Sequence, residues 1–141
     1  MPSSTQDYYL GNPNLKKVGT EIEFTQEQIQ EYLKCKADPV YFAMNYIKII
    51  SLDEGIVPFK MWDFQQELIR NFHENRFNIA KLPRQTGKST TCVSYLLHYA
   101  LFNDNVNIGI LANKLSTARD LLGRLQLAYE QLPLCCLLYT S

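Results

Sequence analysis

One ten-residue segment, K-L-P-R-Q-T-G-K-S-T at positions 81–90, constrains the fold more than any other part of the sequence. The run F-N-I-A-K-L at 77–82 predicts a strand, and residues 88–102 predict a helix. Between them, Pro83 and Gly87 predict a loop, because proline offers no ladder donor and glycine permits unusual backbone angles. A loop that leads from a strand into a helix N-terminus is a common place for proteins to bind phosphate.

The rest of the chain surrounds this unit with further helices and a second strand. Thr25 opens a capping box with Gln28 and predicts a helix to about residue 36. Asp38 and Pro39 predict a second helix start, from which apolar residues recur at helical spacing to Ile50. Positions 61–75 and 115–132 predict two more helices, 53–55 a turn and 106–112 an apolar strand. This order predicts an α/β fold with a parallel sheet.

The loop carries the residue types that nucleotide chemistry needs. Gly87 allows close backbone approach to a phosphate, Lys88 can reach the β and γ phosphates, and the Ser89 hydroxyl can bind Mg²⁺. Leu82 stands where the pattern G-x-x-x-x-G-K-[ST] has its first glycine. Arg84 could approach the transferring group as arginine fingers do, or could be a surface arginine.

An aromatic–glutamine pair precedes the loop by about twenty residues. Phe64 could stack on a base, and the Gln65 amide could offer it a donor and an acceptor. The alternative is that Phe64 belongs to the core of an amphipathic helix and Gln65 is solvated.

Composition sets broad limits on the class of protein. Formal net charge is zero, yet residues 76–141 hold seven Lys and Arg against three Asp and Glu. That basic half fits phosphate chemistry or an ordinary solvated surface. The four cysteines lack C-x-x-C spacing, which predicts reduced thiols in a cytoplasmic setting. No secretory signal and no apolar run of about 18 residues is expected.

Three stretches together resemble the large terminase subunit of tailed bacteriophages of the contractile-tailed myovirus type. They are F-K-M-W-D-F-Q-Q-E-L-I, N-I-A-K-L-P-R-Q-T-G-K-S-T-T and V-N-I-G-I-L-A-N-K-L-S-T-A-R-D-L-L-G-R. The resemblance covers about residues 38–133, and the R-Q-x-G-K-[ST] loop lacks the first glycine in this family too. It implies part of a RecA-like P-loop NTPase domain, with a parallel sheet, preceded by a small helical subdomain.

The family resemblance also implies a function and partners. Such a subunit hydrolyses ATP with Mg²⁺ to drive double-stranded DNA into a procapsid, and a C-terminal nuclease cuts the DNA. It would act as a homo-oligomeric ring in the host cytoplasm, transiently docked on the procapsid, with the phage portal protein and the small terminase subunit as partners, and away from membranes. In this sequence, Phe64 and Gln65 match the adenine motif, and Arg84 matches an arginine that acts in cis on the γ-phosphate. The phosphate loop is matched by Gln85, Thr86, Gly87, Lys88 and Ser89, followed by Thr90.

The sequence departs from the family by ending before the strand that carries Asp-Glu, and before the nuclease carboxylates. Four parts are expected: an extended arm (1–24), a helical subdomain (25–60), the front of the ATPase domain (61–134) and a tail (135–141). The codons for C-L-L-Y-T-S can match a transposase-based sequencing adapter, so we expect this tail to be adapter-derived and the native chain to be longer. An isolated fragment of this kind should be poorly stable.

Two other functions remain open at the level of sequence. A helicase-like or DNA-repair ATPase also pairs an aromatic–glutamine motif with a phosphate loop, but usually carries A-x-x-G-x-G-K-[ST]. The third possibility is a non-catalytic nucleotide-binding module with a degenerate loop.

Overall fold

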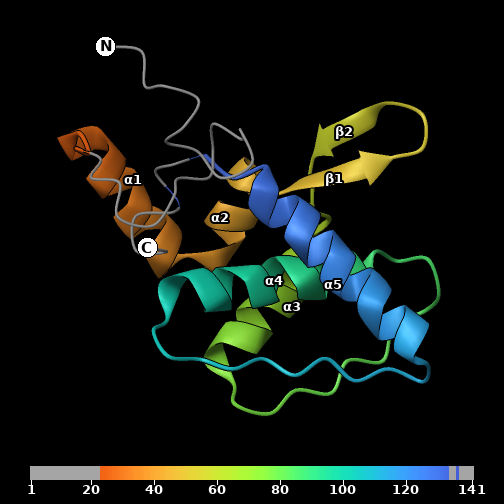
Figure 1. The fold of residues 1–141 in the computed structure, drawn as a ribbon. Coiled ribbons are helices and arrows are strands. Elements are labelled where there is room, and N and C mark those ends of the chain that lie inside the picture. The colour runs from red at the N-terminus through yellow and green to blue at the C-terminus, as the bar shows by residue number, and fades with distance from the viewer. Residues whose placement is uncertain (1–22, 134–135, 137–141) are drawn as a thin grey trace.

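A computed structural model describes residues 23–133 and residue 136. This part of the chain contains five helices and two short strands, with α4 at the centre (Figure 1). Helices α2, α3 and α5 contact α4, and α1 packs on α2. In chain order the elements are α1 (Gln26–Ala37), α2 (Pro39–Tyr46), β1 (Lys48–Ser51), β2 (Gly55–Pro58), α3 (Asp63–Glu74), α4 (Lys88–Phe102) and α5 (Leu115–Glu130).

The predicted parallel sheet, and with it the RecA-like fold class, is wrong. Within the described residues, the one sheet is an antiparallel pair of strands, β1 and β2. The stretches 77–82 and 106–112 form no strand. Their apolar side chains are largely open to solvent, with Phe77 84%, Ile79 101% and Leu111 98% exposed. A parallel pair needs cover on both faces to persist, and these segments lack that cover.

The β1–β2 hairpin was not predicted. The apolar spacing through Ile50 predicted a continuing helix, but α2 ends at Tyr46 and the chain turns extended. The turn at 53–55 is confirmed, and Gly55 supplies it with a positive φ of 76°. Isoleucine and valine at facing positions, Ile49 opposite Val57 and Ile50 opposite Ile56, favour strand over helix here.

The starts of α1 and α2 are as predicted, and each has a capping side chain. Thr25 Oγ1 accepts from the N–H of Gln28, whose Oε1 accepts from the N–H of Thr25 in return. Asp38 Oδ1 accepts from the N–H groups of Val40 and Tyr41, with Pro39 at the first helical position. Such side chains replace the partners that the first N–H groups of a helix lack.

A carboxylate shared by two phenols joins α1 to α2. The hydroxyls of Tyr41 and Tyr46 donate to Glu31 Oε1 over 2.6 and 2.7 Å. These bonds lower the pKa of Glu31, and the bond to Glu31 raises the pKa of Tyr41 to about 12. The carboxylate is thereby kept ionised and the Tyr41 phenol protonated.

The hydrophobic core brings together side chains from α1, α2, α3, α5 and the C-terminal half of α4. Phe42, Ile69 and Leu132 are fully buried there, and Leu97 and Phe102 come from α4 itself. Burial of side chains of this size is the main favourable term for folding.

Several predictions from the sequence lie outside the described residues. The expected arm (1–24) falls there except for its last two residues, and the expected tail (135–141) does so except for Cys136. Cys35, Cys92 and Cys136 are free thiols. None of the helices in the described part has the length and apolar content needed to cross a membrane.

Candidate nucleotide-binding site

The loop before α4 has the backbone shape that close approach to an anion requires. Gly87 is the N-cap of α4, with φ 69° and ψ 17° in the left-handed region. Gln85, two residues earlier, also has a positive φ of 61°. The N–H groups of the first turn of α4 have no intrahelical acceptors, and no acidic side chain lies in that turn. The positive end of the helix dipole is therefore open to an anion.

The Lys88 side chain folds back over this loop. Its exposed Nζ donates to the carbonyl oxygens of Leu82 at 3.3 Å and Pro83 at 3.4 Å. The Thr86 hydroxyl donates to the same Pro83 oxygen at 3.0 Å. The ammonium group is thus held by neutral carbonyls, and an anionic phosphate would be a stronger partner for it.

Lys88 and Ser89 line a cavity of about 250 Å³ beside the loop. Its other walls are apolar: Leu82 and Ala80 come from the segment before the loop, and Ile110 comes from the segment before α5. The two stretches predicted as strands therefore still meet beside the loop, without pairing. Burial raises the pKa of the Cys92 thiol in this wall, which keeps it protonated.

Gln65 connects the start of α3 to the loop. Its Nε2 donates to the Thr86 carbonyl at 3.1 Å, and its Oε1 accepts from the N–H of Trp62 at 3.0 Å. The side chain is only 4% exposed, so the alternative of a solvated glutamine is wrong. Phe64 is half-buried, and its ring centroid lies 5.6 Å from that of the exposed Trp62. A base contact by Phe64 and Gln65 stays a prediction.

The remaining predicted residues divide between the loop and another face of α4. Arg84 and Gln85 are exposed on the loop. Thr90 is turned away from Lys88 and Ser89 and lines a second, larger cavity of about 370 Å³. The structure therefore gathers Gln65 with residues 86–89 and separates Thr90 from them.

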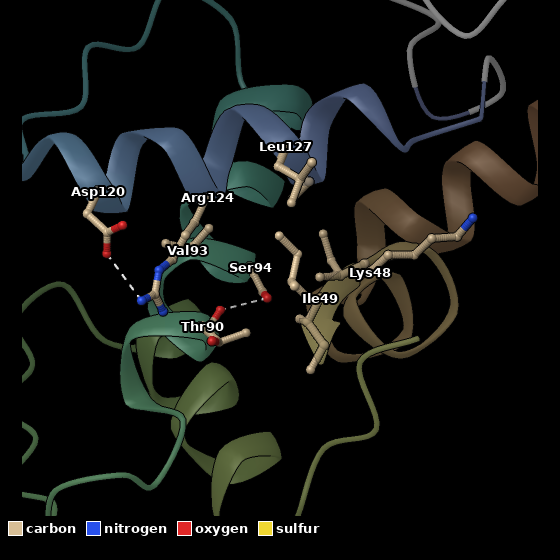
Figure 2. Close-up of a pocket in the computed structure, with 11 residues that line it drawn as sticks. Lys48, Ile49, Thr90, Val93, Ser94, Asp120, Arg124 and Leu127 are labelled. Atoms are coloured by element: carbon tan, nitrogen blue, oxygen red, sulfur yellow. Dashed lines mark hydrogen bonds and ion pairs between the residues drawn. The ribbon is translucent and has the colours of Figure 1, made fainter. Parts of the chain in front are cut away.

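The larger cavity lies between β1, α4 and α5 (Figure 2). Ile49 and Leu127 form part of its apolar wall, and the Ser94 hydroxyl donates to the Thr90 carbonyl at 2.8 Å. Arg124 is paired with Asp120 at 3.2 Å. This ion pair was not predicted from the sequence, although its i,i+4 spacing is visible in R-D-L-L-G-R. Lys48 also lines this cavity, beside the pair of Asp120 and Arg124.

Two further findings bear on the site. The described residues contain no group of three or more His, Cys, Asp or Glu side chains placed to hold a metal ion. A comparison of the sequence with models of known protein families finds no match.

Proposed function

We propose that this chain binds ATP with Mg²⁺ through the loop at residues 83–89, as the nucleotide-binding part of a DNA-packaging motor of the large-terminase type. The observation that carries the ATP site is the left-handed Gly87 at the N-cap of α4, with Lys88 folded over the same loop. Glycine backbone, lysine and hydroxyl follow one another as phosphate binding requires.

The residues present fit a nucleoside triphosphate and its metal. The free N–H groups at the start of α4 would donate to phosphate oxygens, and the Lys88 ammonium would exchange its two carbonyl partners for phosphate. Ser89 would hold the Mg²⁺ ion, which neutralises charge on the β and γ phosphates when bound. Arg84, exposed on the same loop, is our candidate to stabilise charge on the γ-phosphate.

The motor function rests on the three sequence stretches that resemble large terminase subunits. On that proposal, ATP hydrolysis drives double-stranded DNA into the procapsid, in the host cytoplasm. A homo-oligomeric ring would work with the portal protein and the small terminase subunit, and a nuclease would form part of the native protein. The basic excess of residues 76–141 supports contact with a polyanion.

A binding measurement tests the ATP site. The 141-residue chain is titrated with ATP and Mg²⁺ by isothermal titration calorimetry, as wild type and as Lys88→Ala. We expect Lys88→Ala to weaken binding at least about tenfold, because a charge-assisted contact to phosphate is lost. Lys114→Ala is the matched control, since Lys114 is an exposed lysine that makes no side-chain capping bond at the start of α5. Equal affinity in the Lys88→Ala variant and the wild type would refute this site.

A further inference from the structure

The Gln65 side chain joins two backbone groups that are far apart in sequence. One is the N–H of Trp62 at the start of α3, and the other is the carbonyl of Thr86, 21 residues beyond Gln65. A buried amide with one bond at each end cannot rotate without breaking both. The Thr86–Gly87 peptide is therefore tied to α3, an element outside the phosphate loop.

The space around this amide is as restrictive as its bonds. A Cβ atom built on Gly87 would lie 2.5 Å from Gln65 Nε2, closer than real Cβ contacts come. The glutamine thus lies directly against the glycine that turns the chain into α4. A side chain at position 87 would therefore displace the Gln65 amide, which holds the Thr86 carbonyl through its hydrogen bond.

The bonds to backbone leave part of the amide unused. A glutamine side chain has two N–H donors and an oxygen with two lone pairs, and the structure uses one of each on Trp62 and Thr86. A contact to a base would have to use the others. Holding the loop is therefore a separate role from reading a base, and it can be measured separately.

We propose that Gln65 is a positioning residue for the phosphate loop, which holds the Thr86–Gly87 peptide in the conformation that binds the triphosphate. This inference rests on the proposed function, since it assigns a role in the same ATP site. It differs from a base-reading role in one respect: the effect of Gln65 should reach a ligand that has no base.

The test compares two probes, ATP and inorganic triphosphate, each with Mg²⁺. Gln65→Met keeps the length of the side chain and removes both hydrogen bonds. Gln66→Met is the matched control, because Gln66 is the next residue of α3 and its side chain bonds only to Arg70 of the same helix among the interactions described. Affinities are measured by calorimetry, and thermal midpoints of unfolding are measured alongside to confirm that each variant is folded.

We expect Gln65→Met to weaken the binding of both probes by the same factor of about tenfold, because the bond that holds the Thr86 carbonyl is lost and the loop is no longer preorganised. Gln66→Met should bind both probes as the wild type does. If Gln65→Met binds inorganic triphosphate like the wild type, the proposal is wrong. If only ATP binding is weakened, Gln65 reads the base and does not position the loop.

Two other outcomes can be distinguished from these: a variant that does not fold, and a wild type that binds neither probe. If Gln65→Met does not fold, Gln65→Glu replaces it, because a carboxylate can still accept from the Trp62 N–H but cannot donate to Thr86. The added charge is then accounted for by repeating the titration at high salt, where repulsion is screened. If the wild type binds neither probe, the proposed function fails together with this inference, whereas wild-type binding with an unchanged variant refutes the inference alone.

Discussion

The two halves of α4 have opposite surroundings. Its first residues, Lys88 and Ser89, face an exposed loop and a small cavity. Its last turns, by contrast, place Leu97, His98 and Phe102 in the core, each at most 6% exposed. One helix can therefore present free N–H groups at one end, because packing of the other end holds the helix and its start needs no capping side chain.

Aromatic contacts and one hydrogen bond make the packing of the second half specific. The ring centroids of His98 and Phe102 lie 4.7 Å apart, and the rings of Phe42 and Phe102 meet edge to face at 5.5 Å and 88°. His98 Nε2 is 2.8 Å from the Cys35 carbonyl oxygen, so this nitrogen carries the proton and donates. These contacts attach α4 to both α1 and α2.

The largest effect should come from removing the ring at the centre of this packing. Phe42→Ala should lower the free energy of unfolding by about 3–5 kcal/mol, because the buried ring leaves a cavity. Phe42 is 0% exposed and contacts both His98 and Phe102. Urea denaturation followed by circular dichroism gives the measurement.

Lys88→Ala is the matching change in the open half. It should alter the free energy of unfolding by less than about 0.5 kcal/mol, since Lys88 is exposed. A loss below about 1 kcal/mol for Phe42→Ala, or a larger loss for Lys88→Ala, would contradict this difference between the two halves of α4. A chain with no cooperative transition would instead support the expectation that it is poorly stable in isolation.

The second-largest effect should come from acid, which weakens the packing of the buried half of α4. Burial lowers the pKa of His98 from 6.5 to about 4, although the hydrogen bond to the Cys35 carbonyl acts in the opposite direction. The unfolded chain therefore binds more protons than the folded one between these values. The contribution of neutral His98 to the free energy of unfolding should be fully present above pH 6.5. It should fall by up to about 3 kcal/mol as the pH drops to 4. Urea denaturation at several pH values measures this slope.

A buried ring nitrogen of His98 explains this dependence of stability on pH and suggests a control variant. His98 Nδ1 is buried and has no hydrogen-bond partner among the described residues, so a proton there would be unsatisfied. His98→Gln keeps an N–H donor for Cys35 and removes the titration, and it should flatten the slope between pH 6.5 and 4. The pKa of Glu31 is lowered from 4.5, so its contribution to stability begins to be lost only as the pH falls below about 4.5, at the acid end of this window. An unchanged slope in His98→Gln would assign the effect to another group.

The sequence predicted best the elements that depend on local chemistry. Thr25 and Asp38 marked helix starts because capping is decided within three residues. The loop ahead of α4 followed for the same reason, since Gly87 and the lysine after it act locally. Lys88 and Ser89 lie together on the first turn of α4 because they are adjacent in the sequence.

Features that depend on contacts between residues far apart in the sequence could not be predicted from local patterns. Strand-like stretches such as 77–82 indicate extended backbone, but pairing depends on partners and cover that the residues themselves do not specify. The contact of Gln65 with Thr86 crosses 21 positions, and no local pattern distinguishes it from a solvated glutamine. The hairpin was missed because Ile47 and Ile50 keep the i,i+3 spacing of a helix, and the four residues of β1 are too few to reveal the alternation of a strand.

A smaller loss of stability than those caused by Phe42→Ala and by acid is expected in the open half of α4. Gly87→Ala should lower the free energy of unfolding by about 1–2 kcal/mol, because a φ of 69° is unfavourable for alanine. It should also weaken ATP binding, since the new methyl group would displace the Gln65 amide that lies 2.5 Å from its position. Urea denaturation and calorimetric titration measure the two effects on the same variant.

Gly123→Ala provides the control for this change. Gly123 lies within α5, its φ is not positive, and a Cβ there meets no described atom within 4 Å. The same substitution should therefore stabilise the chain by up to about 1 kcal/mol through helix propensity, with no effect on ATP binding. If Gly87→Ala were as harmless as Gly123→Ala, the left-handed turn would not be a requirement of the loop. The open half of α4 would then differ from the buried half only in exposure, and not in a backbone shape built to receive phosphate.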